Sequence, residues 1–308
     1  MSFAACGDTG ASAEDDQFLI GVCQIEPHAA LDAATQGFKD ALIAEFGEDK
    51  VKFIDGNAAG DSNTLNTIIQ DFVAKDVDLI LANATPVLQA AASATTVIPI
   101  LGTSVTEYGV ALELEDFNGL VGGNISGTSD LAPLDKQAQM ILDWCPDAKN
   151  VGMLYCSAEA NSVYQVNQVK AYLEDKGLTC TAYSFSSTSD LAAVAQKAVS
   201  ESDVLYVPTD NTVANSTPIV DSICREKKIP VIAGEENICK GCGIATLSIS
   251  YYDLGTTTGK MAAQILKGEA DISQMPIAYA ETQTAKYNKE LCEYLNIEPL
   301  EGYVAIED

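Results

Sequence analysis

The chain has 308 residues, of which 47% are hydrophobic and 20% are charged. This composition is typical of a folded protein, and the length fits two domains of ordinary size. Forty-four acidic against seventeen basic residues give a formal net charge of −27, and such a field repels nucleic acids and anionic membrane surfaces. No run of about 18 apolar residues occurs, so the sequence predicts no membrane-spanning helix.

The first residues resemble the end of a bacterial lipoprotein signal. Small residues, Ala4 and Ala5, precede Cys6, and in such signals the cysteine receives lipid and becomes the mature N-terminus. We therefore expect residues 1–17 to form an acidic tether that contacts the membrane only through a lipid on Cys6. A chance Ala-Ala-Cys in a cytosolic protein is the alternative.

From Phe18 onward, apolar strands and amphipathic helices alternate along the chain. The predicted strands lie at 18–25, 51–55, 78–84 and 98–101. The predicted helices lie at 31–46, at 64–74 and from Pro86 onward. Regular alternation of this kind predicts a parallel sheet that is covered by helices on both faces.

The same pattern begins again in the second half. Ile20 and Val151 open the two halves, and Ile98-Pro99-Ile100 has a counterpart at the same offset in Ile229-Pro230-Val231. Leu79-Ile80-Leu81 likewise corresponds to Val204-Leu205-Tyr206. We therefore expect an α/β fold of two similar, doubly wound parallel-sheet lobes. A chance recurrence of generic βα units is the alternative.

The domain organisation follows from this repeat. We expect lobe one to comprise residues 18–122 plus 252–275, and lobe two to comprise residues 123–251 plus 276–308. The chain would then cross between the lobes three times, near 123, 251 and 276. Such a multi-strand hinge permits closure without unfolding either lobe.

The second half opens with a strand at 151–155 that runs through a polar turn into an amphipathic helix. Ligands of open parallel sheets bind outside the carboxyl ends of the strands, where helix N-termini present unpaired N–H groups. The polar turn at Glu159 to Ser162 is therefore a candidate for binding. An ordinary helix cap is the alternative.

Six short motifs together resemble the substrate-binding proteins of bacterial ABC transporters, in the family that includes the tryptophan-binding TrpX-like proteins. The similarity covers nearly all of residues 18–285. The motifs are His28-Ala29-Ala30-Leu31-Asp32 with Gly37-Phe38-Lys39-Asp40, Thr85-Pro86 with Gln89-Ala90-Ala91, Ser104-Val105-Thr106, Glu159-Ala160-Asn161-Ser162-Val163, Pro208-Thr209-Asp210-Asn211, and Tyr251-Tyr252-Asp253-Leu254-Gly255. One departure is Glu107-Tyr108, where the family usually has Asp-Pro.

The resemblance implies a type I periplasmic-binding-protein-like fold that captures an amino acid in its interlobe cleft by hinge closure. It implies an aromatic ligand (Trp, Phe or Tyr), and an ABC permease with its ATPase subunits as partners. It places the protein outside the cytoplasm, lipid-anchored on the cytoplasmic membrane or periplasmic. We expect a monomer, with no cofactor, no metal and no nucleic acid partner.

The candidate ligand-binding residues are Thr85, Ser104, Thr106, Glu159, Asn161, Ser162, Asp210 and Asn211. Asp210 and Glu159 could accept hydrogen bonds from an α-ammonium. Thr85, Ser104, Asn161 and Ser162 could donate to an α-carboxylate. Helix capping is the alternative for each acid and for Ser162. Tyrosines could stack on an apolar ligand side chain, although packing in the core is the more common role. These tyrosines are Tyr108, Tyr155, Tyr206, Tyr251 and Tyr252.

Other classes of function have less support in the sequence. An enzyme would need motifs that are missing, since neither G-x-S-x-G nor the phosphate-loop pattern occurs and His28 is the single histidine. A transcriptional regulator would need a basic DNA-binding segment. A binding protein for a sugar or nucleoside, a surface sensor and an adhesin stay open. For Cys239 and Cys242, a local disulfide or two free thiols are favoured over a metal site.

Overall fold

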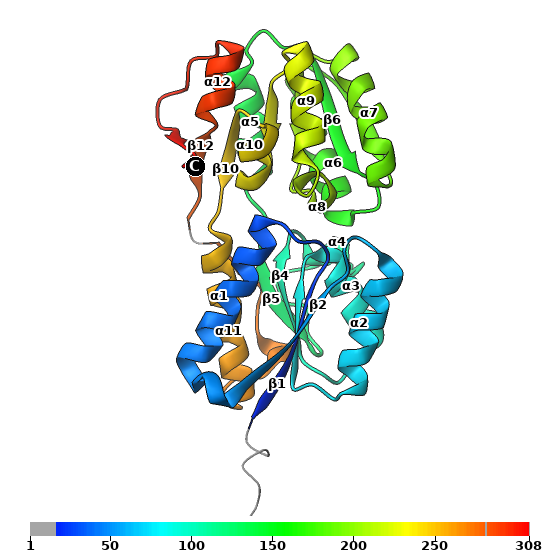
Figure 1. The fold of residues 1–308 in the computed structure, drawn as a ribbon, viewed down its shortest axis with the longest axis vertical. Coiled ribbons are helices and arrows are strands. Elements are labelled where there is room, and N and C mark those ends of the chain that lie inside the picture. Colours follow the sequence, from blue (N-terminus) through cyan, green and yellow to red (C-terminus); the bar gives the residue numbers. More distant parts are fainter. Residues whose placement is uncertain (1–16, 281, 308) are drawn as a thin grey trace, which may run out of the picture.

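The computed structural model describes residues 17–280 and 282–307, which form two lobes joined at a narrow waist (Figure 1). Cys6 and nearly all of the predicted tether lie outside the described residues. Within the described part, no helix is both long enough and apolar enough to cross a bilayer.

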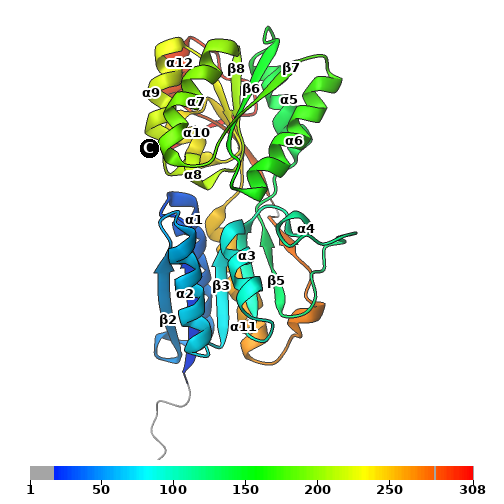
Figure 2. The same ribbon diagram turned by 90° about the vertical axis from the view of Figure 1, so that its right-hand side faces the viewer.

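Lobe one is built on a parallel sheet in the order β11-β5-β4-β3-β1-β2. Its strands are β1 (Phe18–Gln24), β2 (Val51–Asn57), β3 (Leu79–Asn83), β4 (Ile100–Val105), β5 (Ile125–Ser129) and β11 (Ala278–Tyr279). Its helices are α1 (Ala29–Phe46), α2 (Ser62–Ala74), α3 (Thr85–Ala94), α4 (Tyr108–Ala111) and α11 (Tyr251–Leu266), with short 3₁₀ turns η1 (Glu48–Lys50) and η2 (Ile272–Gln274). Alternate strand residues pack against α1 and α11 on one face and against α2 and α3 on the other (Figure 2).

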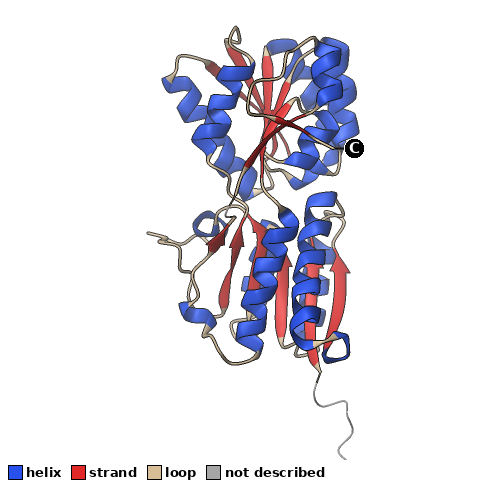
Figure 3. Ribbon diagram, turned by 90° about the vertical axis from the view of Figure 1, so that its left-hand side faces the viewer, coloured by secondary structure: helices blue, strands red, loops and turns tan. Residues whose placement is uncertain are grey.

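Lobe two is built on a sheet in the order β13-β12-β10-β9-β8-β6-β7, parallel apart from the antiparallel pairing of β10 with β12. Its strands are β6 (Asn150–Cys156), β7 (Thr179–Phe185), β8 (Val204–Val207), β9 (Val231–Ala233), β10 (Ala245–Ser248), β12 (Thr284–Tyr287) and β13 (Val304–Ala305). Its helices are α5 (Leu134–Trp144), α6 (Ala160–Asp175), α7 (Thr188–Glu201), α8 (Asn211–Ala214), α9 (Thr217–Lys227), α10 (Glu236–Cys242) and α12 (Lys289–Leu295). Figure 3 shows helices on both sides of each sheet.

The sheet registers confirm the predicted duplication. The order β2-β1-β3-β4-β5 in lobe one is repeated as β7-β6-β8-β9-β10 in lobe two. Ile20 pairs with Leu79 as Val151 pairs with Val204. Ile100 pairs with Ile80 as Val231 pairs with Leu205. The repeat is therefore structural and not a chance recurrence.

Two of the three predicted crossings were misplaced, and with them the lobe boundaries at 122/123 and 275/276. β5 pairs with β4, and β11 pairs with β5, so residues up to Ser129 and the segment 278–279 belong to lobe one. Residues 122–123 lie in a turn before β5, where Gly122 (φ 81°) and Gly123 (φ 60°) adopt left-handed backbone conformations. The crossing between β10 and α11 lies at 249–250, as predicted.

Candidate ligand-binding cleft

A small chamber lies between the lobes, where the carboxyl ends of the strands of both sheets meet. Lobe one lines it with His28, Leu31, Ser104, Thr106, Asp130 and Tyr251. Lobe two lines it with Asn161, Thr209, Asp210, Asn211, Ala214 and Glu235. The chamber has about 10 Å³ of free space, roughly the room that one water molecule needs. The lobes are therefore closed on each other, and a solute can enter only if they separate.

The structure brings five of the eight predicted site residues to this chamber. They are Ser104, Thr106, Asn161, Asp210 and Asn211. Thr85, Glu159 and Ser162 are buried but do not line it. Thr85 begins α3, and Ser162 lies in the first turn of α6.

The two predicted ammonium acceptors already have protein partners. Asp210 accepts from the backbone N–H of Cys156 (2.7 Å) and of Val213 (2.9 Å), and the second bond caps α8. Glu159 accepts from the backbone N–H of Asn211 (3.0 Å) and of Thr212 (2.9 Å) and from both their side chains. Burial, reinforced by the charge of Glu159, raises the pKa of Asp210 to about 8. Both acids thus hold the loop at α8 in place.

Asp130 is the site residue that sequence analysis missed. It follows β5 at the first crossing and is 4% exposed. The Tyr251 hydroxyl donates to its Oδ2 (2.9 Å), while Oδ1 is buried with no hydrogen-bond partner. Burial raises the pKa of Asp130, and the hydroxyls of Thr106 and Tyr251 oppose that shift. Its position directly after a strand could have identified Asp130 as a site residue. The crossing predicted near 123 instead assigned this segment to lobe two.

A third acid, Glu235, was also missed and has a structural role. It accepts from the backbone N–H groups of Asn237 (2.6 Å) and Ile238 (2.5 Å), which caps α10. Burial raises the pKa of Glu235 to about 7. Within the described residues, the chamber wall therefore carries three acidic side chains, Asp130, Asp210 and Glu235, and no lysine or arginine. Asp130, whose Oδ1 has no hydrogen-bond partner there, can accept from a cationic group of a ligand.

Unpartnered polar atoms gather at the chamber. His28 Nδ1, Ser104 Oγ, Asp130 Oδ1 and Asn161 Oδ1 are all buried and make no hydrogen bond, and the neighbouring Thr85 Oγ1 is in the same situation. Buried polar groups in folded proteins are nearly always partnered. Ser104 also has a left-handed backbone (φ 54°) at an irregularity in β4, and such strain is often found at ligand sites. This concentration is typical of a site for a polar ligand.

Within the part of the chain that the structure describes, two hydrogen bonds join the lobes across the cleft. Asn215 Nδ2 donates to Glu26 Oε2 (2.7 Å), and His28 Nε2 lies 3.3 Å from Asn211 Oδ1. Burial lowers the pKa of His28, so the imidazole is neutral near pH 7. These bonds exist only when the lobes are together, and they stabilise the closed arrangement.

Of the five candidate tyrosines, only Tyr251 reaches the chamber. Tyr108 and Tyr206 are fully buried, and their hydroxyls donate to the Thr128 carbonyl and to Gln137. Tyr155 packs against the core of lobe two, and Tyr252 donates to Asp40 at the surface of lobe one. Packing thus accounts for the others.

The cysteines give no metal site in the described part of the chain. Cys239 and Cys242 are buried free thiols of α10. Burial raises the pKa of both, so neither is a reactive thiolate. Across the described residues, no group of three or more His, Cys, Asp or Glu side chains could hold a metal ion.

Two closed lobes, three crossings and a polar chamber between them define a solute-binding protein with the type I periplasmic-binding-protein fold. The chain belongs to the ABC transporter substrate binding protein family, whose model matches residues 19–303. Proteins of this family act outside the cytoplasm, where they bind small molecules and deliver them to ABC transporters.

Similar proteins include binders of aromatic amino acids. The tyrosine-binding protein of Clostridioides difficile (strain R20291) is 35% identical over 286 residues, which cover 91% of this chain and 81% of that protein. The ABC domain in complex with L-Trp from Streptococcus pneumonia is 34% identical, with a TM-score of 0.89 over 94% of this chain and all of that one.

The ligand-free, open structure of a substrate binding protein with adhesive properties from Clostridium difficile is 36% identical, but its TM-score is only 0.71 over 94% of this chain and 99% of that one. Sequence identity is nearly the same in these two structural matches, whereas the TM-score is higher for the ligand-bound one. The lobe arrangement of this chain therefore resembles the ligand-bound form.

Proposed function

We propose that this protein captures an aromatic L-amino acid (Trp, Tyr or Phe) at the interlobe chamber, which widens to hold it, and presents it with the lobes closed around it to an ABC importer. Two observations support this ligand class. Two relatives that align over most of the chain are a tyrosine-binding protein and a structure in complex with L-Trp, and the chamber combines acidic and hydroxyl groups with the ring of Tyr251. A ligand that touches both lobes binds the closed form better than the open one, and this difference drives closure.

The observation that carries the proposal is the unpartnered Oδ1 of Asp130. We assign to this oxygen the α-ammonium of the ligand, because the oxygens of Asp210 and Glu235 already accept backbone N–H groups. A charge-assisted bond in a buried site is among the stronger polar contacts in proteins. Asp210 and Glu159 then act indirectly, by fixing the loop that carries Asn211.

The α-carboxylate would contact the donors that face the same chamber. Ser104 has a free hydroxyl, and Thr106 and Asn161 flank it from the two lobes. The N-termini of α3 and α6 add the partial positive charge that an acidic protein otherwise lacks here. Thr85 and Ser162, in the first turns of these two helices, support this part of the site.

Isothermal titration calorimetry with a panel of amino acids, sugars and nucleosides tests the proposal. We expect Trp, Tyr or Phe to bind at micromolar concentration or tighter, about −8 kcal/mol. Two analogues separate the contacts: tryptamine lacks the carboxylate and indole-3-propionate lacks the ammonium. Both should bind far more weakly than the amino acid, because each leaves one set of buried polar groups unpaired.

The variant Asp130→Asn should weaken binding by about thirtyfold or more, since it removes a buried charge opposite the ammonium. Asn keeps an oxygen that can accept from Tyr251, so the fold is preserved. Asp135→Asn, an exposed acid at the start of α5, is the matched control and should bind normally. Saturable binding of a sugar or nucleoside alone, or unchanged affinity in Asp130→Asn, would contradict the proposal.

We further propose that the protein is a monomer held at the membrane by a lipid on Cys6. The support is the Ala-Ala-Cys sequence and the acidic stretch after it. Mass spectrometry of the N-terminal peptide from the native host should detect a diacylglycerol-modified cysteine, and Cys6→Ser should release the protein from membranes.

A further inference from the structure

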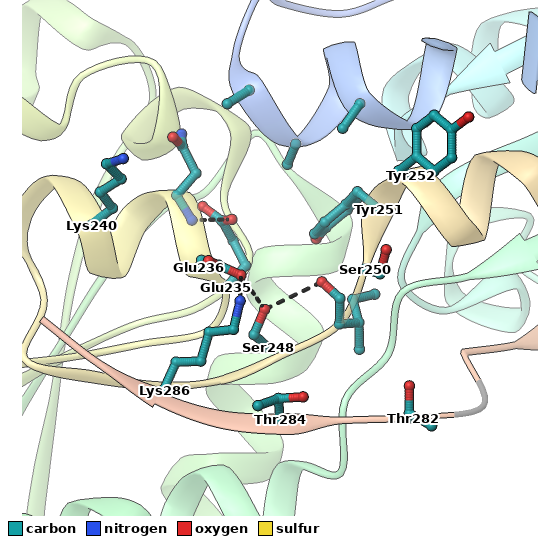
Figure 4. A pocket seen from close by; sticks show the side chains of 15 residues that line it. Glu235, Glu236, Lys240, Ser248, Ser250, Tyr251, Tyr252, Thr282, Thr284 and Lys286 are labelled. Carbon is teal, nitrogen blue, oxygen red and sulfur yellow. Dashed lines mark hydrogen bonds and ion pairs between the residues drawn. The ribbon is translucent and has the colours of Figure 1, made fainter. Parts of the chain in front are cut away.

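A second cavity, which we call the hinge pocket, lies beside the chamber and has a volume of about 390 Å³ (Figure 4). Helix α1 of lobe one lines it with Ala29, Ala30 and Ala33, and α10 and β12 of lobe two line the opposite side. The crossing segment 248–252 completes the wall. Glu235 and Tyr251 line both the hinge pocket and the chamber, so the two cavities share a wall.

The carboxylates of the hinge pocket are occupied by protein donors. Glu235 accepts from two backbone N–H groups of α10. Glu236 Oε2 accepts from Lys286 Nζ (2.7 Å) and from Ser248 Oγ (2.7 Å), as the dashed lines in Figure 4 indicate. A cationic ligand would therefore compete with bonds that are already made.

The lysines of the hinge pocket, in contrast, have N–H donors that are not used in bonds to the described residues. An ammonium has three N–H donors. Within the described residues, Lys286 makes one bond, to Glu236, and Lys240 at the edge makes one, to the Glu307 carbonyl (3.1 Å). Two lysines against two glutamates also make this pocket far less negative than a chain of net charge −27 is on average. The free donors favour an anionic group, and the balanced charge of the pocket does not repel it.

The remainder of the wall combines small apolar side chains of α1 with hydroxyl groups, among them Ser250, Thr282 and Thr284. Three alanines of α1, with Ile249 and Tyr251, form the apolar side of the pocket. Small-molecule sites are commonly mostly apolar, with a few placed polar groups, and have volumes of about 300–1,000 Å³. We propose that the hinge pocket is a second ligand site, for a small carboxylate with an apolar body, and that its occupation favours the closed form.

Occupation of the hinge pocket favours the closed form because its walls come from both lobes. The pocket is complete in the closed arrangement, and both lobes and a hinge segment contact whatever fills it. A molecule that fits only this arrangement shifts the population toward it. Binding in the chamber and in the hinge pocket would then be positively coupled, by equal factors in both directions.

Phenylacetate is a suitable probe, with phenylacetamide as its uncharged match. We expect calorimetry on the full chain to detect saturable phenylacetate binding and at least tenfold weaker binding of the amide. Asp130→Asn should bind phenylacetate within twofold of wild type, because Asp130 does not line the hinge pocket. Persistence of this binding in Asp130→Asn also separates this inference from the proposed amino acid function, which could fail independently.

Two variants test whether phenylacetate binds in the hinge pocket. Lys286→Met should weaken phenylacetate at least tenfold, and Ala33→Leu should abolish its binding by filling the pocket, while Lys289→Met, at an exposed lysine of α12, should have no effect. Saturating phenylacetate should tighten chamber binding of the amino acid about fivefold. The inference is overturned if wild type does not bind phenylacetate, if the amide binds equally well, if Asp130→Asn abolishes binding, or if both pocket variants bind as wild type.

Discussion

The acidic side chains around the cleft are buried, where water cannot solvate them. Asp210 is fully buried, Glu235 is 4% exposed, and burial raises their pKa to about 8 and about 7. Burial also raises the pKa of Asp130 and Glu26. The hydrogen bonds that these acids accept favour their ionised forms, but burial outweighs them. The folded state therefore has a higher affinity for protons than the unfolded chain has.

This proton affinity predicts a pH dependence of stability. Between pH 6.5 and 8 the folded protein binds protons on Asp210 and Glu235 that the unfolded chain has released, so stability is lost as pH rises through their folded pKa values. The lowered pKa of His28 acts in the opposite direction, and this effect fades as pH rises above its ordinary value of 6.5. The exposed Asp61 and Asp203, whose pKa values hydrogen bonds lower, titrate below about pH 4. We expect the free energy of unfolding to fall by about 1 kcal/mol per pH unit in this window.

Denaturant unfolding at pH 6.5, 7.25 and 8 measures this slope. Glu235→Gln removes one of the titrating groups and should reduce the slope, whatever it does to absolute stability. Stability that is flat or rises with pH in this window would show that the cleft carboxylates are ionised in the folded state.

Helices α1 and α11 form the element pair that positions the hinge. Gly37 and Gly255 lie where the two helices touch: a Cβ on Gly37 would come within 2.1 Å of the Tyr252 carbonyl oxygen, and one on Gly255 within 1.9 Å of the Ala34 carbonyl oxygen. The motifs containing Gly37 and Tyr251 to Gly255, far apart in the sequence, thus pack directly on each other. Because α11 begins immediately after the second crossing, this packing fixes where Tyr251 meets Asp130.

Gly255→Ala should destabilise the protein. Alanine improves helix propensity by about 1 kcal/mol, but a 1.9 Å contact with a backbone atom forces the helices apart, and overpacking costs about 1–3 kcal/mol or more. We expect a net loss of about 1–2 kcal/mol and a melting temperature lower by several degrees. Lys260→Ala, at an exposed position of the same helix, should change little. A Gly255→Ala protein as stable as wild type would mean that the helices separate without cost.

At the level of elements, the sequence predicts what depends on local apolar pattern. The strands that open each half are continuous apolar runs, and their register across the two lobes agrees with the predicted correspondence. β5 was not predicted as a strand, because the polar residues Ser126 and Thr128 interrupt its apolar pattern. Both are fully buried, and their hydroxyls bond Met275 and Thr258, residues distant in the chain. A strand whose polar side chains bond to residues far away in the sequence cannot be recognised from its local sequence pattern.

The site was predictable to a similar extent. Polar residues that follow strands identified Ser104, Asn161 and Asp210, because the carboxyl ends of parallel strands share one edge. Which acid keeps a free oxygen was not predictable. That outcome depends on the backbone N–H of Cys156, which donates to Asp210 Oδ2. The two residues are 54 positions apart in the sequence.

At the scale of the whole molecule, function depends on the balance between open and closed forms. The structure has the lobes together, with interlobe bonds from Asn215 to Glu26 and between His28 and Asn211. Hydrogen bonds to charged groups contribute about 1.5–3 kcal/mol when buried, and less where one partner is exposed. Glu26 is 7% exposed, whereas Asn215 is at the surface. The Asn215–Glu26 bond should therefore stabilise closure by about 1 kcal/mol.

Asn215→Ala tests this balance without touching the chamber wall. Loss of the bond should weaken amino acid affinity roughly fivefold, mainly through faster dissociation, because the bond forms only on closure. Surface plasmon resonance gives the two rate constants, and Asn66→Ala, at an exposed asparagine of α2, is the matched control. A cycle with Glu26→Ala should show that the second change adds little to the first. If the two effects are additive, or if dissociation is unchanged, the bond does not hold the lobes together and closure depends on the ligand alone.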